Sequence, residues 1–158
     1  MVDQVTAYQP RSYEDLKLRS LILANGIAKF AERLPPLTEY GVCAMPAVKW
    51  VFIPRCDAAD AVDCYVRVRE LLDEILPDLA ASMMAEDWGT AVWVWEHCRP
   101  NIKWLNERLL QMYLVARACD CYLEGWTFED EAAWEFGLGK LIDETGFNQF
   151  YLRPGQTS

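Results

Sequence analysis

The chain has 158 residues, 53% of them apolar and 13% aromatic, and its formal net charge at pH 7 is −9. The apolar content excludes a disordered chain, and the length favours a single domain over residues 1–158. The negative charge argues against direct binding to nucleic acid or to an anionic membrane, because both repel acidic surfaces.

The charge is distributed unevenly along the chain. Residues 1–56 contain seven Lys/Arg and five Asp/Glu (net +2), whereas residues 57–158 contain eight Lys/Arg and nineteen Asp/Glu (net −11). The N-terminus lacks the features of a signal peptide, and no apolar run reaches the roughly 18 residues that span a bilayer. We therefore expect a cytoplasmic protein whose six cysteines are reduced.

The first elements are a helix and a short extended segment. Ser12 can cap a helix over 12–34, in which Asp15 offers a weak capping partner. Asn25-Gly26 interrupts the pattern, so the segment is either one helix with a weak point or two pieces, and it ends before Pro35. Residues 48–53 are rich in β-branched and aromatic side chains, which suits a short strand.

Two further helices are expected in the middle of the chain. Asp57 or Asp60 can cap a helix over 58–76, which Pro77 ends. A short helix is expected over 78–86.

The segment 88–99 is ambiguous. Its apolar run has the composition of a strand, but Thr90 can also cap a helix. Because an isolated pair of strands is marginal without a larger sheet, we favour a helix. The alternative is an α+β fold with a small antiparallel sheet made from 48–53 and 91–96.

The strongest periodicity follows Pro100. Apolar residues recur at alternating steps of three and four over 100–124, which predicts a long helix: Ile102, Leu105, Leu109, Met112, Ala116, Cys119 and Leu123. Gly125 should end this helix, Thr127 should cap the next one over 128–145, and Gly146 should end that one.

We therefore predict a mainly α fold, a single-domain bundle of about four principal helices. These helices lie near 12–34, 58–76, 100–124 and 128–145, and residues 1–11 and 153–158 are expected to be frayed ends.

Signals for chemistry are weak. His97 is the only histidine, and it could bind zinc only together with Cys98, Cys119 and Cys121. The C-x-C spacing on a helix places the thiols of Cys119 and Cys121 on opposite faces, which argues against a zinc site. We predict no metal, no cofactor and no catalysis. Acidic pairs such as Glu70 with Glu74, or Glu131 with Glu135, are expected on solvated helix faces.

The acidic residues are concentrated in two blocks. Residues 57–87 and 120–144 each carry a net charge of −7. In the second block, the candidate binding residues combine carboxylates with two tryptophans: Glu124, Trp126, Glu129, Asp130, Glu131, Trp134 and Glu135. In the first block, the candidates are the acids of a helix and its cap: Asp60, Asp63, Glu70, Asp73 and Glu74.

These blocks predict a protein that acts by protein–protein contact with a basic surface. Such a protein can inhibit a nucleic-acid-binding protein by charge mimicry, provided that the acids converge in space. The first alternative is a homo-oligomeric helical subunit, such as a homodimer whose interface is the seam at 102–123. The second is an enzyme that uses carboxylates or a metal.

Overall fold

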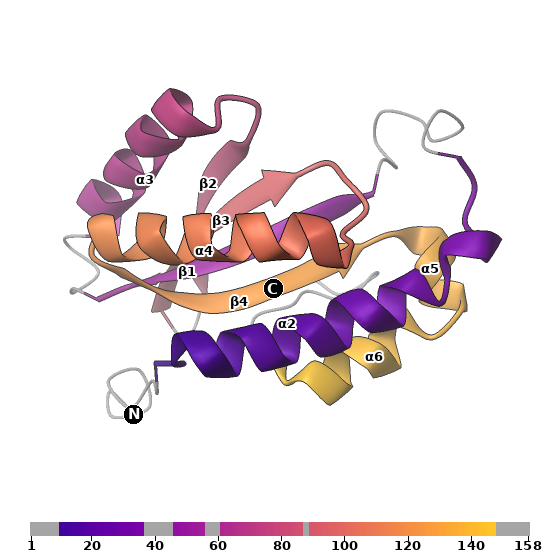
Figure 1. Cartoon of the computed structure of the whole chain (residues 1–158). Helices are drawn as coiled ribbons and strands as arrows, with labels where there is room; N and C mark the ends of the chain where they lie inside the picture. The colour runs from indigo at the N-terminus through magenta and orange to yellow at the C-terminus, as the bar shows by residue number, and fades with distance from the viewer. Residues whose placement is uncertain (1–9, 37–45, 56–60, 87–88, 148–158) are drawn as a thin grey trace.

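The computed structural model describes residues 10–36, 46–55, 61–86 and 89–147. Within these ranges the chain forms four β-strands, five α-helices and a 3-10 turn at Ala31–Arg33. The strands build one sheet, and helices cover one of its faces (Figure 1). The prediction of an all-α helical bundle is therefore wrong, and the protein has an α+β fold.

The sheet contains β1 (Ala47–Pro54), β2 (Ala80–Glu86), β3 (Gly89–Glu96) and β4 (Cys121–Glu129). The strand order is β2-β3-β1-β4, and every neighbouring pair is antiparallel. The central pair joins 48–52 of β1 to 92–96 of β3, as the alternative α+β interpretation expected.

The connections follow a simple plan. Helix α3 (Ala61–Ile75) links β1 to β2, and α4 (Ile102–Ala118) links β3 to β4. In this β-α-β-β-α-β order, β3 lies between β1 and β2, the two strands that α3 connects, which is the ferredoxin-like arrangement. Helix α2 (Tyr13–Ala28) precedes it, and α5 (Glu131–Glu135) and α6 (Leu138–Thr145) follow it. The topology alone assigns no function.

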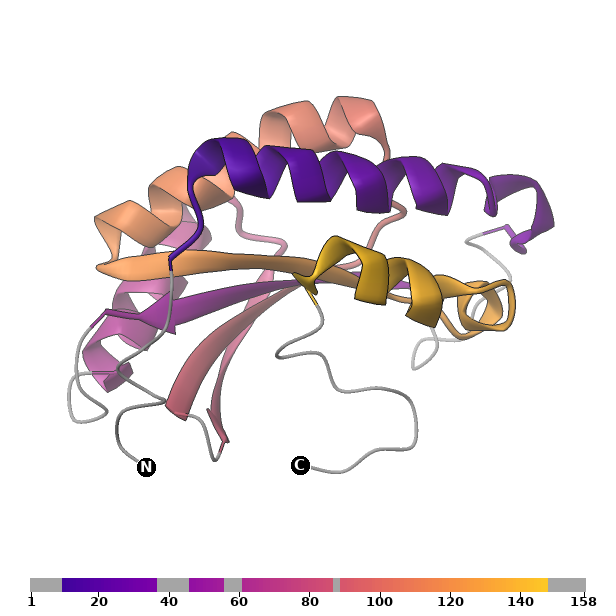
Figure 2. The same cartoon turned by 90° about the horizontal axis from the view of Figure 1, so that it is seen from below.

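The main core lies between the sheet and the helices. Figure 2 shows α2 and α4 on the same side of the sheet. The β1 side chains Val48, Trp50 and Phe52 face the helices, whereas Lys49 and Val51 lie on the other face. The helices contribute apolar residues at helical spacing, among them Leu16 and Leu23, Val68 and Leu72, and Leu105 and Leu109.

Residues 88–99 and 78–86 were both predicted as helix, and both predictions are wrong. Residues 89–96 form β3, which is paired on both sides and is therefore no isolated strand. Residues 80–86 form β2, although Ala, Met and Glu favour helices, because pairing with β3 outweighs local propensity.

The predicted helices at 100–124 and 128–145 are wrong at their junction. Helix α4 ends at Ala118, and Asp120 takes a left-handed conformation with φ 59°. Strand β4 follows, so Leu123 leaves the helical seam and Gly125 lies inside the strand, beside a register shift. Thr127 caps nothing, and Asp130 caps α5 by accepting from the backbone of Ala132 and Ala133.

Other predictions of helix boundaries are confirmed. The Ser12 hydroxyl accepts from the Asp15 backbone N–H at 3.1 Å, although α2 ends at Ala28 rather than near residue 34. Helix α3 matches the helix expected at 58–76, and Gly146 ends α6 with φ 72°. The expected caps Asp57 and Asp60 lie outside the described residues. Of the expected frayed ends, 1–11 and 153–158, only residues 10 and 11 are described, and Arg11 pairs with Glu124.

Among the described residues, none of the helices is both long enough and apolar enough to span a membrane.

Candidate functional site

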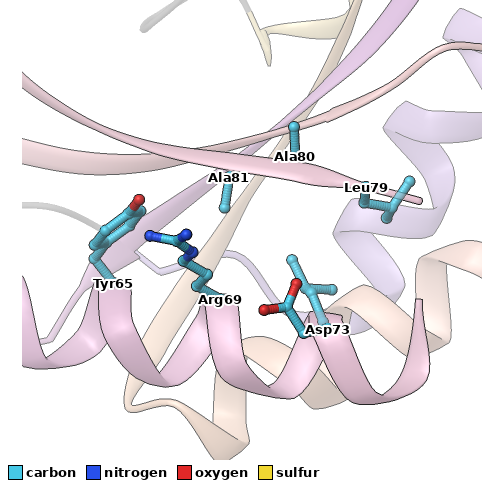
Figure 3. Close-up of a pocket in the computed structure, with 7 residues that line it drawn as sticks. Tyr65, Arg69, Asp73, Leu79, Ala80 and Ala81 are labelled. Carbon is cyan, nitrogen blue, oxygen red and sulfur yellow. The ribbon is translucent and has the colours of Figure 1, made fainter. Parts of the chain in front are cut away.

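A groove of about 350 Å³ lies between α3 and β2 (Figure 3). Three of its residues come from one stripe of α3, and the others come from the buried face of α3, the turn after it and the start of β2: Tyr65, Arg69, Leu72, Asp73, Leu79, Ala80 and Ala81. The groove is half open to solvent, and its exposed lining, which includes two charges of opposite sign, is more polar than apolar.

Local sequence explains the position of the groove. Helix α3 buries Cys64, Val68 and Leu72 in the core, so the neighbouring stripe at Tyr65, Arg69 and Asp73 lies at the margin of the helix–sheet contact. The chain turns directly after α3, where the backbone N–H groups of residues 76 and 79 donate to the carbonyls of residues 72 and 76. Strand β2 therefore runs back along the same stripe.

The two charged groups in the groove are available to a partner. Arg69 and Asp73 are exposed and lie one helical turn apart. Within the part of the chain that the structure describes, neither forms an ion pair or a side-chain hydrogen bond. Arginine preceding aspartate is the less favourable order for a pair within a helix, so each group can bind an outside charge at little cost.

The groove lies beside an edge of the sheet. Strand β2 is the outermost strand, and in the described residues only β3 pairs with it. Its first residues, Ala80, Ala81 and Ser82, are small and uncharged, so they do not block the edge. An unprotected edge presents backbone N–H and C=O groups that another strand can pair with.

The opposite edge, at β4, is occupied. The Arg11 Nε donates to the Glu124 carbonyl at 2.9 Å, and Arg11 Nη2 contacts the Glu124 carboxylate at the same distance. A Cβ added at Gly125 would lie 2.5 Å from the ring of Phe147. Of the two sheet edges, β2 is therefore the better suited to a partner.

Most candidates of the second acidic block serve the fold itself. Glu124 is buried and paired with Arg11, and Asp130 is the cap of α5. Trp126 is fully buried and donates to the Ser20 hydroxyl at 2.9 Å. Glu131 and Glu135 are exposed, and Trp134 is half-buried against the core.

Glu129 pairs with the buried Lys49 on the sheet face opposite the helices. Lys49 is fully buried there, with its ammonium 3.8 Å from the centre of the Trp93 ring and 3.7 Å from a Glu129 oxygen. Burial raises the pKa of Glu129, and the charge of Lys49 opposes the rise.

The acids of the first block behave differently. Asp63, Glu70, Asp73 and Glu74 are all exposed on α3, while Asp60 lies outside the described residues. Figure 1 shows α3 beside β2 and α5 at the other end of the molecule, so the structure does not bring the two blocks together. Of the predicted site residues that the structure describes, only Asp73 lines the groove.

The sheet positions one further polar cluster that sequence reasoning missed. The buried Glu96 carboxylate accepts from Trp104 at 3.1 Å, from Trp50 at 3.4 Å and from Arg108 at 2.9 Å. These groups come from β1, β3 and α4, so the cluster joins α4 to the sheet. No local motif marks it, since the partners meet only after folding.

The candidate zinc ligands do not assemble. Among the residues that the structure describes, no group of three or more His, Cys, Asp or Glu side chains could hold a metal ion. His97 is exposed, Cys98 is half-buried, and Cys119 and Cys121 are buried in the core.

Cys98 is expected to react slowly with alkylating reagents. Burial, followed by the charge of Glu96, raises the pKa of Cys98 to about 12, against the opposing effect of Arg108. At pH 8 its thiolate fraction should be about a thousandfold below that of an ordinary cysteine. Iodoacetamide labelling read by peptide mass spectrometry should show a Cys98 rate that still rises above pH 10. Equal labelling rates at pH 8 in buffer and in urea would contradict this.

The sequence does not predict the groove, because the residues of β2 favour a helix locally. The available signal was the i, i+4, i+8 stripe of Tyr65, Arg69 and Asp73 beside the apolar seam of α3.

Comparison of the chain with protein-family models, with curated proteins and with solved structures finds no match.

Proposed function

We propose that this protein is a non-catalytic binding module that takes up an extended segment of a basic partner protein. The segment adds to the open edge of β2 as a fifth strand and packs its side chains against α3. The observation that carries the proposal is the groove between α3 and an edge strand that begins with small residues. Strand addition beside a helix is a recurring mode of peptide recognition.

The backbone of β2 would supply most of the affinity. Main-chain hydrogen bonds to a sheet edge do not depend on the partner's sequence, whereas pockets for alternate side chains select among partners. Ala80 and Ala81 leave space at the edge, and Leu72 and Leu79 supply an apolar floor.

Charge favours a basic partner. The exposed ionic groups on α3 are four acids, Asp63, Glu70, Asp73 and Glu74, against Arg67 and Arg69. This excess of acid on α3 steers basic segments toward the helix and repels acidic ones, more weakly as the salt concentration rises. The cytoplasm stays our proposed compartment, on the sequence argument of reduced thiols.

The test starts from a displayed library of random linear peptides, selected on the full-length protein. Each selected peptide is resynthesised with single N-methyl groups along its backbone, and its affinity is measured by fluorescence polarisation. Strand addition predicts losses at every second position, because alternate residues of a strand direct their N–H groups to the same neighbour. Losses without this alternation, or no selected peptide at all, would contradict the proposal.

Two arginine variants locate the binding site. Ala81→Arg places a long side chain in the groove and should weaken selected peptides by about tenfold or more. Ala118→Arg is the matched control, since Ala118 is exposed at the end of α4. Equal binding by the two variants would place the peptide elsewhere. A second copy of the chain is the competing occupant, and light scattering would detect it as a dimer that Ala81→Arg dissociates.

A further inference from the structure

The groove orders its side chains along a line. In α3, Tyr65, Arg69 and Asp73 follow one another at intervals of one turn, and all three line the groove. Figure 3 shows Tyr65 at one end and Asp73 at the other, close to Leu79. An extended segment in the groove therefore meets an aromatic ring, a cation and an anion in succession.

The spacing of these three positions along α3 is close to that of alternate residues in a strand. Residues four apart in a helix are separated by about 6 Å along its axis. Residues two apart in a strand are separated by about 7 Å and point to the same face. Over three positions the helix spacing and the strand spacing differ little. Alternate side chains of an added strand can therefore each face one of the three α3 residues.

The direction of the added strand follows from the rest of the sheet. All three strand pairs of this sheet are antiparallel, and antiparallel pairing is slightly more stable for each residue. Strand β2 runs from the Asp73 end of the groove toward the Tyr65 end. A partner antiparallel to β2 therefore meets Tyr65 first, Arg69 second and Asp73 third.

From this order we infer that the groove reads a sequence pattern in its partner: an apolar residue, then an acidic one, then a basic one, at alternate positions from the N- to the C-terminus. The acidic side chain faces Arg69 and the basic one faces Asp73. This inference rests on the proposed strand addition and specifies its ligand. Opposite charges placed face to face favour one register, and like charges in the exchanged peptide oppose it.

The test uses two short peptides of the same composition. Both carry threonine at intervening positions, and one carries leucine, glutamate and lysine in that order, while in the other the glutamate and lysine are exchanged. The native protein should bind the first peptide about tenfold more tightly at low salt, and the preference should shrink as salt is added. The double variant Arg69→Asp with Asp73→Arg keeps the net charge of the protein and should prefer the second peptide.

The outcomes separate the two claims. If both peptides bind equally and N-methylation still acts at alternate positions, strand addition stands and the charge pattern is wrong. A native preference for the second peptide would overturn the inferred direction. If neither peptide binds, the proposed function fails together with the pattern. Should the double variant not fold, peptides with glutamine in place of glutamate or of lysine test the same two contacts on the native protein.

Discussion

Replacing Arg108 with alanine is expected to lower the free energy of unfolding by about 3 kcal/mol. Arg108 contacts the Glu96 carboxylate through Nε and Nη2, at 3.1 Å and 2.9 Å. The Glu96 residue is only 7% exposed, so the variant leaves a carboxylate in the core without its counter-charge. The value lies at the lower end of the usual range because the Arg108 side chain keeps 20% of its surface exposed. Urea unfolding followed by circular dichroism measures the change.

Arg55→Ala is the matched control for this prediction. Arg55 also pairs with an acid, Asp120, but at 3.8 Å and with both side chains half exposed. Such a surface pair contributes at most about 1 kcal/mol. If the two variants lower the unfolding free energy equally, Glu96 does not depend on Arg108 for its stability in the core.

The local features of the helices could be predicted from the sequence. The Ser12 cap, the body of α3 and the Gly146 stop each depend on a few neighbouring residues, and each is found in the structure. The apolar seam of α4 is also present from Ile102 to Ala116, and most of it is buried against the sheet. A homodimer could therefore not use this seam without opening the core.

The strands could not be predicted in the same way, because their stability comes from distant partners. In β2, Ala, Met and Glu are good helix formers, and only β3 makes the segment extended. Leu123 of β4 continues the heptad spacing of α4 by coincidence, and this continuation conceals the turn at Asp120. In β3, residues 91–94 are buried on both faces of the sheet, so the strand lacks the alternation of polar and apolar residues.

The same limit applies to the candidate site. The sequence identified the acids of α3, including Asp73, because their composition is visible without a fold. It could not distinguish them from Glu124 and Asp130, which are equally acidic but bind Arg11 and cap α5. Burial and pairing decide which carboxylates can meet a partner, and both depend on tertiary structure.

Replacing Trp50 with alanine is expected to cost about 3–5 kcal/mol, a large part of the stability of a typical domain. Trp50 lies in the central strand β1 with no exposed surface, and its ring centre is 5.6 Å from that of Trp104 and 6.0 Å from that of Trp126. The variant would leave a cavity among these rings and remove the Trp50 hydrogen bond to Glu96. Urea unfolding should show the loss, and near-ultraviolet circular dichroism should show weaker aromatic signals.

Trp95→Ala is the control for the Trp50 prediction, because Trp95 is only half-buried on the opposite face of the sheet. It should cost clearly less than Trp50→Ala, since less apolar surface is lost from the interior. The comparison also tests the fold. In a helical bundle, residue 50 would lie in a connection between helices, and its truncation would change stability little. A small effect of Trp50→Ala would therefore contradict the central place of β1 in the sheet, on which the position of the β2 edge depends.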